Sequence, residues 1–243
     1  MFPVSLAYND VALYVLCPAQ ADGELHVTAS DADQVTAENG LLSVRLTGSG
    51  EHAIALSDGS TQTVRAELPE EKPITGWKVD FELWTAGQER DIRTETLNGK
   101  TVTESAVKTE VIQVPVALET LTGWDQIPEV GPDAVGQARY EASFEWDGSA
   151  AGAYLDLGTV LESMRVSLNG QTIPGVSMTD GRVDLGPWLQ EGANTLVIEY
   201  SSSISNAIGN SAPAGWYGYH TGKLSYGPSQ AVLIPYTTVE IQQ

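Results

Sequence analysis

Residues 140–200 constrain the fold more than any other part of this sequence. Apolar and polar residues alternate along four short segments there, residues 140–146, 153–157, 163–168 and 195–200. A period of two is typical of β-strands with one buried face. Turn-forming pairs such as Asn169-Gly170 and Asp180-Gly181 separate the segments, and these residue types tolerate the positive φ angles of tight turns. The pattern predicts a β-sandwich.

The amino-terminal part of the sequence also predicts short strands. Six segments alternate in polarity or are rich in β-forming residues: 4–7, 12–16, 24–29, 41–46, 52–56 and 62–67. Asn, Asp, Gly or Ser bounds each of them, and no stretch has a sustained helical period. We therefore predict a small antiparallel β domain over residues 1–70.

A linker and a larger β-domain follow. Residues 69–76, PEEKPITG, combine two prolines, a charge cluster and a glycine, which is typical of linkers. Strands resume over residues 77–85 and 109–117, with Asn98-Gly99 as a hairpin tip in the polar stretch between them. A final strand or strand pair lies in residues 229–241. These signals predict a second β-domain over residues 74–243.

The charge of the chain excludes several classes of partner. Its 32 acidic and 12 basic residues give a formal net charge of −20, which disfavours nucleic acid and anionic membranes. No apolar run is long enough for membrane insertion, and the start lacks the pattern of a signal peptide. We expect either a cytoplasmic protein or a piece of a longer secreted chain. The single cysteine, Cys17, excludes an internal disulfide and a cysteine-based zinc site, and its apolar neighbours indicate a buried thiol.

No catalytic constellation stands out in the sequence. Glycoside hydrolysis needs two facing carboxylates, but no motif singles out a pair among the acidic residues. Gly48-Ser49-Gly50 does not match a nucleophile elbow, and no contiguous D-x-D-x-D-G calcium loop occurs. His26, His52 and His220 lack the spacing of a zinc site. We predict no catalytic residue in this chain.

One aromatic segment is the best candidate for a binding site. Residues 201–222 form a connection rich in Ser, Asn and Gly, longer than most loops. Its candidate ligand-binding residues are Asn206, Asn210, Trp216, Tyr217, Tyr219 and His220. Sugars offer flat C–H faces that stack on aromatic rings and hydroxyls that hydrogen-bond to amide and imidazole groups. The alternative is that Trp216 and Tyr219 fold back to cover the edge of the sandwich.

An ordered set of short motifs resembles a known family. The motifs are ITGW (74–77), LTGW (121–124), GQARY with Phe144 (136–144), LDLG (155–158), VSLNG (166–170), RVDL with Trp188-Leu189 (182–189), EGANTL (191–196), LSYGP (224–228) and AVLIP (231–235). Together they resemble the galactose-binding-like β-sandwich, or jelly roll, of glycoside hydrolases. Within that group, the motifs are similar to those of the C-terminal sandwiches of large bacterial α-L-rhamnosidase-type enzymes, and the resemblance covers residues 74–243.

This resemblance implies a fold and a role. The fold would be an all-β, antiparallel galactose-binding-like jelly-roll sandwich preceded by a small β unit. The role would be that of a non-catalytic carbohydrate-binding or bracing module, whose partners are a carbohydrate or an adjacent catalytic domain. The parent protein would be a secreted or cell-surface bacterial glycoside hydrolase acting on plant or microbial glycans. No cofactor is implied, although such sandwiches often carry a structural Ca²⁺. The alternative is a structural or adhesive β-sandwich protein with no sugar-binding activity.

Most conspicuous residues of the resembling motifs have a structural explanation. Asn169-Gly170 suits a two-residue hairpin turn. Asp184 and Asn194 lie at turns, where their side chains can hydrogen-bond to nearby backbone. Asp156 either faces solvent or holds a neighbouring loop. Trp77, Trp124 and Trp188 are predicted core residues.

Overall fold

The computed structural model describes residues 25–38, 41–160, 162–176, 181–204 and 226–241. In these ranges the chain forms β-strands and two short 3₁₀ helices, η1 (Trp124–Gln126) and η2 (Gly186–Trp188). Every strand pair in the described part of the chain is antiparallel. The predicted all-β, antiparallel fold is confirmed.

A six-stranded sheet forms one layer of the larger sandwich. Its strands, in spatial order, are β12 (Gln171–Thr172), β11 (Ser163–Leu168), β14 (Gly192–Ser201), β9 (Gly136–Trp146), β7 (Trp77–Leu97) and β8 (Lys100–Leu118). Buried and exposed residues alternate along β9 and β14, so one face of this sheet packs on the core and the other faces solvent.

The second layer of the sandwich is built on β15 (Val232–Ile241). The first half of β15 pairs with β10 (Gly152–Asp156), which in turn pairs with β13 (Arg182–Asp184). Side chains from both layers meet in one core cluster, including Phe81, Tyr140 and Ile198 from the first layer and Leu155 and Leu233 from the second. The rings of Phe81, Trp124, Tyr140 and Tyr200 contact one another edge to face, which is a favourable arrangement of aromatic side chains.

A smaller β unit precedes the sandwich. Its strands are β1 (Val27–Ala29), β2 (Gln34–Glu38), β3 (Leu41–Leu46), β4 (Gly50–Leu56) and β5 (Thr61–Ala66). It has its own core cluster, which contains Leu42, Val44, Ile54 and Ile241. The last of these residues comes from the far end of the chain.

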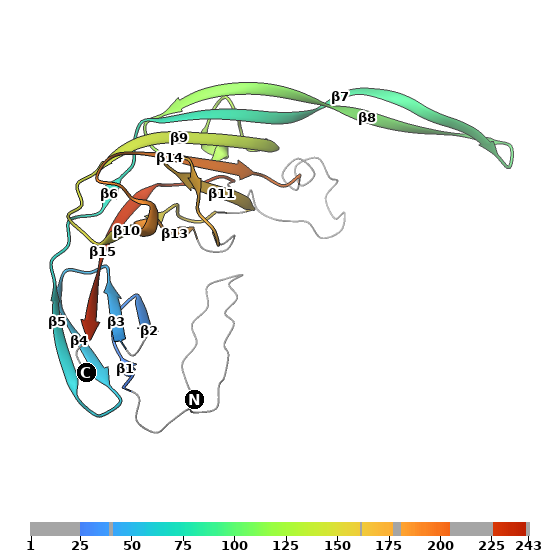
Figure 1. The fold of residues 1–243 in the computed structure, drawn as a ribbon. Helices are drawn as coiled ribbons and strands as arrows, with labels where there is room; N and C mark the ends of the chain where they lie inside the picture. Colours follow the sequence, from blue (N-terminus) through green and yellow to red (C-terminus); the bar gives the residue numbers. More distant parts are fainter. Residues whose placement is uncertain (1–24, 39–40, 161, 177–180, 205–225, 242–243) are drawn as a thin grey trace.

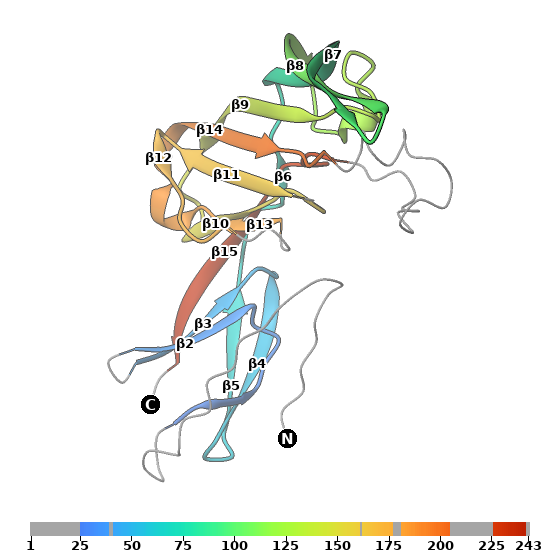
Figure 2. The same cartoon turned by 90° about the vertical axis from the view of Figure 1, so that its right-hand side faces the viewer.

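The strand β15 joins the two units (Figures 1 and 2). Residues 232–236 pair with β10 of the sandwich, whereas residues 237–241 pair with β3 of the small unit. The predicted linker also contributes a short strand, β6 (Lys72–Pro73), which pairs with Val232 and Leu233. The division into domains 1–70 and 74–243 stays a prediction, but the last five residues of β15 belong to the sheet of the first unit.

The hairpin of β7 and β8 is much longer than the sequence indicates. We expected strands over residues 77–85 and 109–117 with a polar stretch between them, but β7 and β8 continue to the turn and extend away from the sandwich (Figure 1). The predicted tip is confirmed, since Asn98 (φ 51°) and Gly99 (φ 75°) both adopt the positive φ that this type of turn requires.

Other local predictions have mixed outcomes. The Asn169-Gly170 turn is confirmed by φ angles of 52° and 78°. Trp77 and Trp124 are buried as predicted, whereas Trp188 is only partly buried against the core cluster. The short strands β2, β12 and β13 were not predicted, because each is too short or too polar for alternation to show. The predicted strands 4–7 and 12–16, and Cys17, lie outside the described residues.

Candidate functional site

The solvent-facing side of the six-stranded sheet carries an ordered set of polar side chains. Strand register aligns a row of alternating charge across four strands, listed here from β7 to β11: Asp80, Arg139, Glu199 and Arg165. A second row, two residues along each strand, contains Glu82, Gln137, Ser201 and Ser163. Residues two apart on a strand share a face, so both rows face the same side.

These two rows line a cavity of about 360 Å³, which we call the outer groove. Its lining consists of Asp80, Glu82, Gln137, Ala138, Arg139, Ser163, Met164, Arg165, Glu199, Tyr200 and Ser201. Gly136 lies beside it, where β9 starts against β7. A Cβ at that position would approach the Glu82 carbonyl oxygen to 1.9 Å, and φ is 152°. Glycine is therefore required at the place where the two strands that form this end of the groove meet.

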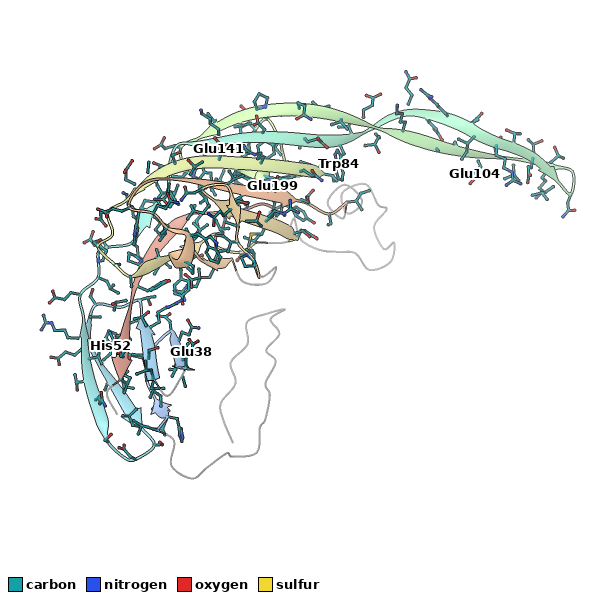
Figure 3. All side chains as sticks on the ribbon, in the orientation of Figure 1. Glu38, His52, Trp84, Glu104, Glu141 and Glu199 are labelled. Atoms are coloured by element: carbon teal, nitrogen blue, oxygen red, sulfur yellow. The ribbon has the colours of Figure 1, made fainter. Side chains whose placement is uncertain are left out.

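Ion pairs and a tryptophan give the outer groove its chemical character. Arg165 lies 3.0 Å from Glu199, and Arg139 lies 2.7 Å from Glu141. Next to the groove, the Trp84 indole nitrogen donates to the Glu82 carboxylate over 3.0 Å. Trp84 is 37% exposed, and Figure 3 shows it near the end of the sheet that also carries Glu199. Carboxylates, guanidinium groups, an amide and an accessible aromatic ring therefore lie together on one face.

A second polar cluster, the junction cluster, connects the small unit to the sandwich. Arg45 on β3 donates through the same guanidinium nitrogen to Asp184 (2.8 Å) and to the Tyr154 hydroxyl (3.0 Å). The Tyr236 hydroxyl donates to the other oxygen of Asp184 over 2.9 Å. The Arg45 guanidinium lies 4.0 Å from the centre of the Tyr236 ring, close enough for a cation–π interaction.

Arg182 adds a contact in the reverse sense to the junction cluster, because it lies on the sandwich and reaches the small unit. Its guanidinium lies 4.6 Å from the centre of the Tyr154 ring and donates to Asp33 of the small unit over 3.1 Å. Asp33 in turn accepts from the Thr47 backbone N–H and hydroxyl. One cation from each unit therefore reaches a carboxylate of the other unit, and both stack against tyrosines of the sandwich.

Burial and charge together determine the pKa values in the junction cluster. Burial raises the pKa of Tyr236, and its hydrogen bond to Asp184 raises it further. Burial by itself would lower the pKa of Arg45, but its hydrogen bonds to Tyr154 and Asp184, together with its charge interactions with Tyr236 and Asp184, outweigh burial, so this pKa is also raised. Arg45 therefore stays charged and Tyr236 stays protonated at neutral pH, and both donate to the same carboxylate.

The six ligand-binding residues predicted from the sequence lie outside the described residues. These are Asn206, Asn210, Trp216, Tyr217, Tyr219 and His220. Sequence reasoning missed the outer groove and the junction cluster. The alternation in β7, β9 and β14 showed that one face is polar, but not which residues of different strands lie side by side.

Three residues interpreted as turn residues do make the expected contacts. Asp184 accepts from the Gly186 backbone N–H over 2.9 Å, and Asn194 bonds to the backbone of Gln190 and Gly192. Asp156 accepts from the Gly158 N–H over 2.8 Å and so holds the adjacent loop. Asp184 has a second role that was not predicted, because its partners Arg45 and Tyr236 are distant in sequence.

Metal-binding side chains do not gather in the described part of the chain. Within those ranges, no group of three or more His, Cys, Asp or Glu residues could hold an ion, so a structural Ca²⁺ stays a prediction. The His52 ring lies 2.9 Å from Asp31 and 3.0 Å from the Gly48 carbonyl, which accounts for both nitrogens structurally. No helix within those ranges is long and apolar enough to cross a bilayer.

Comparisons with known proteins give matches among solved structures alone. No protein-family profile matches the chain, and no curated protein matches it. A rhamnosidase structure from Novosphingobium sp. PP1Y aligns over 88% of this chain, with 17% identity and a TM-score of 0.42. An α-L-rhamnosidase structure from Aspergillus terreus aligns over the same share, with 14% identity and a TM-score of 0.22. The alignments cover 23% and 29% of those chains, so this chain spans less than a third of either protein.

Proposed function

We propose that this chain is a non-catalytic carbohydrate-binding module that binds glycan in the outer groove. The observation that carries the proposal is the double row of carboxylate, guanidinium, amide and hydroxyl groups that lines a cavity of about 360 Å³. Sugar hydroxyls both donate and accept hydrogen bonds, so they suit a surface that offers both kinds of partner. The partly exposed ring of Trp84, next to Glu82, supplies an aromatic surface on which a sugar could stack.

The charge of the chain favours a neutral glycan over other polar ligands. Asp80, Glu82 and Glu199 outnumber Arg139 and Arg165 in the groove, on a chain with a formal net charge of −20. A phosphate or nucleic-acid ligand would meet net repulsion there. A neutral sugar has no such cost, because it needs hydrogen-bonding groups and not countercharge.

The same proposal includes a larger parent protein. The motif resemblance to rhamnosidase-type sandwiches supports a glycoside hydrolase whose catalytic carboxylates lie on another domain. In that setting the junction cluster would brace the module, because Arg45 and Arg182 tie the small unit to the sandwich on two sides. We also propose that the sandwich is of the galactose-binding-like jelly-roll type.

The binding proposal is tested by titration with rhamnose- and galactose-containing glycans, followed by calorimetry and tryptophan fluorescence. We expect the wild-type chain to bind one of these glycans. Trp84→Ala and Gln137→Ala should each weaken binding about fivefold to tenfold, as loss of a central contact typically does. Glu240→Gln, an exposed change on β15 in the small unit, is the matched control and should leave the affinity unchanged.

Other outcomes would contradict the proposal in distinguishable ways. If Trp216→Ala removes binding while both groove variants bind normally, the site is the aromatic segment predicted from the sequence and not the outer groove. If no glycan binds to any form, the alternative of a structural or adhesive β-sandwich protein is favoured. Turnover of an aryl glycoside by the purified chain would overturn its non-catalytic role.

A further inference from the structure

The outer part of the β7–β8 hairpin has no packing partner in the described structure. All residues from 88 to 110 are exposed on both faces of a two-stranded ribbon. Figures 1 and 3 show this ribbon, which we call the arm (residues 86–109), projecting away from the sandwich with Glu104 on its outer half. Isolated two-stranded ribbons are only marginally stable in water, so an arm of this length is better explained by a partner.

The two edges of the arm differ in their ability to pair with another strand. Register shifts between Ala86 and Glu89 and between Asp91 and Arg93 show that β7 carries two bulges, which interrupt its edge. On β8 no residue is inserted, so its backbone runs without interruption. In the described part of the chain, β8 pairs with β7 alone. Its far edge is therefore a long, regular row of backbone donors and acceptors that could pair with a further strand.

Pro115 indicates which backbone groups of β8 point outward. Pro115 lies opposite Asp80 and has no N–H, so its nitrogen must face away from β7. Alternate residues of a strand face the same edge, and β8 has no bulge to break the alternation. Thr101, Thr103, Ser105 and Val107 therefore present their N–H and C=O groups to the free edge.

The arm is also electrically neutral, unlike the rest of the chain. Residues 86–109 contain four basic residues (Arg90, Arg93, Lys100 and Lys108) and four acidic residues (Glu89, Asp91, Glu95 and Glu104). The formal net charge of −20 is therefore carried entirely by the remaining residues. Repulsion from the net charge of two copies is therefore weakest where arm meets arm.

We propose that β8 pairs edge to edge with β8 of a second copy, antiparallel and centred on Ala106. Antiparallel pairing about Ala106 places Glu104 of each copy opposite Lys108 of the other, which gives two opposite-charge pairs beside the centre. Thr103 then lies opposite Thr109, and the small Ala106 meets itself on the two-fold axis. The same patch serves both copies, as a closed dimer requires.

Neighbouring registers fit the charges less well. Centring on Glu104 places that residue against itself and Lys100 against Lys108. Centring on Val107 places Glu104 against Glu110. Centring on Ser105 matches Lys100 with Glu110, but it does so at the two ends of the paired segment, where strands fray. Registers centred between two residues are excluded, because they would place the outward-facing N–H and C=O groups of one strand opposite residues of the other strand whose groups face β7.

Pairing through the arms also keeps the two acidic bodies apart. In the proposed register, residue 112 of one copy lies opposite residue 100 of the other, so the two residues 112 are twelve positions apart. At about 3.3 Å per residue this is roughly 40 Å, which is several times the Debye length of about 8 Å at physiological salt. Charge repulsion between the two sandwiches is therefore screened and does not oppose the association of the arms.

The test is sedimentation of the full chain over a concentration range from low to several hundred micromolar. We expect a monomer–dimer equilibrium for the wild type. Glu104→Lys and Lys108→Glu each replace two attractive pairs by two repulsive ones and should weaken the dimer about tenfold or more. The double variant Glu104→Lys/Lys108→Glu exchanges the partners and should restore it. An equimolar mixture of the two single variants should form a mixed dimer although neither pairs with itself.

Two further variants test the edge and keep the proposal falsifiable. Val107→Pro removes an outward N–H without removing a bond to β7, so it should abolish the dimer while circular dichroism stays unchanged. Replacing residues 86–109 by Asn-Gly deletes the arm and joins Thr85 to Glu110, which are paired across β7 and β8, so it should give a monomer with an intact sandwich. A wild type that is monomeric throughout would overturn the proposal, as would a dimer that survives deletion of the arm. A dimer insensitive to the charge exchanges would overturn the register.

Discussion

Asp184 illustrates how one side chain combines a local role with a distant one. Its carboxylate closes a turn by accepting from the Gly186 N–H, and it also accepts from Arg45 and Tyr236. Arg45 reaches it from β3, 139 positions away in the sequence. The first role follows from the residue type and its neighbours, whereas the second depends on the packing of two units.

Replacing Asp184 by Asn tests the junction cluster. The change leaves the half-buried Arg45 without its charged partner, so we expect a loss of about 1–3 kcal/mol in the free energy of unfolding, measured in urea. The matched control is Glu67→Gln, in an ion pair with Arg65 that is 70% and 79% exposed, against 21% and 30% for Arg45 and Asp184. The control should cost less than about 0.5 kcal/mol. Equal losses for both changes would show that the junction contributes no more than a surface pair.

The strand β15 is the element on which both units depend. Its first half completes the second layer of the sandwich, and its second half pairs with β3 and places Ile241 in the core of the small unit. A single extended strand cannot bend freely while both halves are paired, so the two units are held by one continuous backbone.

Ile241→Ala tests this dependence. Truncation of a buried isoleucine typically costs about 2–5 kcal/mol, and we expect the loss to fall on the small unit. Amide hydrogen exchange should accelerate in β3 and β4 but not in β9 or β14. Thr238→Ala, at an exposed position of the same strand, is the control and should change neither. Uniform acceleration in both units would show that they unfold as one cooperative body.

For the molecule as a whole, the buried tyrosines predict how stability depends on pH. Burial raises the pKa of Tyr140, Tyr200 and Tyr236 above the ordinary value. Above about pH 10 the unfolded chain releases these protons while the folded chain keeps them. The folded state then binds more protons, so the free energy of unfolding must fall as pH rises, by up to about 1.4 kcal/mol per pH unit for each tyrosine.

Urea unfolding between pH 8 and pH 11 measures this effect. General charge repulsion also grows in this range, so Tyr236→Phe serves as the internal comparison. The variant loses the hydrogen bond to Asp184 at every pH but has one fewer tyrosine to ionise. The difference in stability between wild type and variant should therefore shrink as pH rises above 10. A constant difference would contradict the role assigned to Tyr236.

Much of the fold was predictable because its causes are local. Alternation in residues 140–146 and 195–200 predicted β9 and β14, and the Asn98-Gly99 and Asn169-Gly170 pairs predicted two turns that the φ angles confirm. The length of β7 and β8 was not predictable in this way. Residues 89–105 are exposed on both faces, so no apolar alternation marks them as strand.

By itself, the sequence determined the fold class, the turns and the acidic character of the chain, since each depends on residue type and near neighbours. The tertiary structure alone decided which strands are adjacent. Adjacency assembles the outer groove from four strands, brings Arg45 to Asp184 and divides β15 between two units. Among the described residues it also leaves the far edge of β8 without a strand partner. These features depend on contacts between residues far apart in the chain, and a pattern that repeats every two residues carries no information about them.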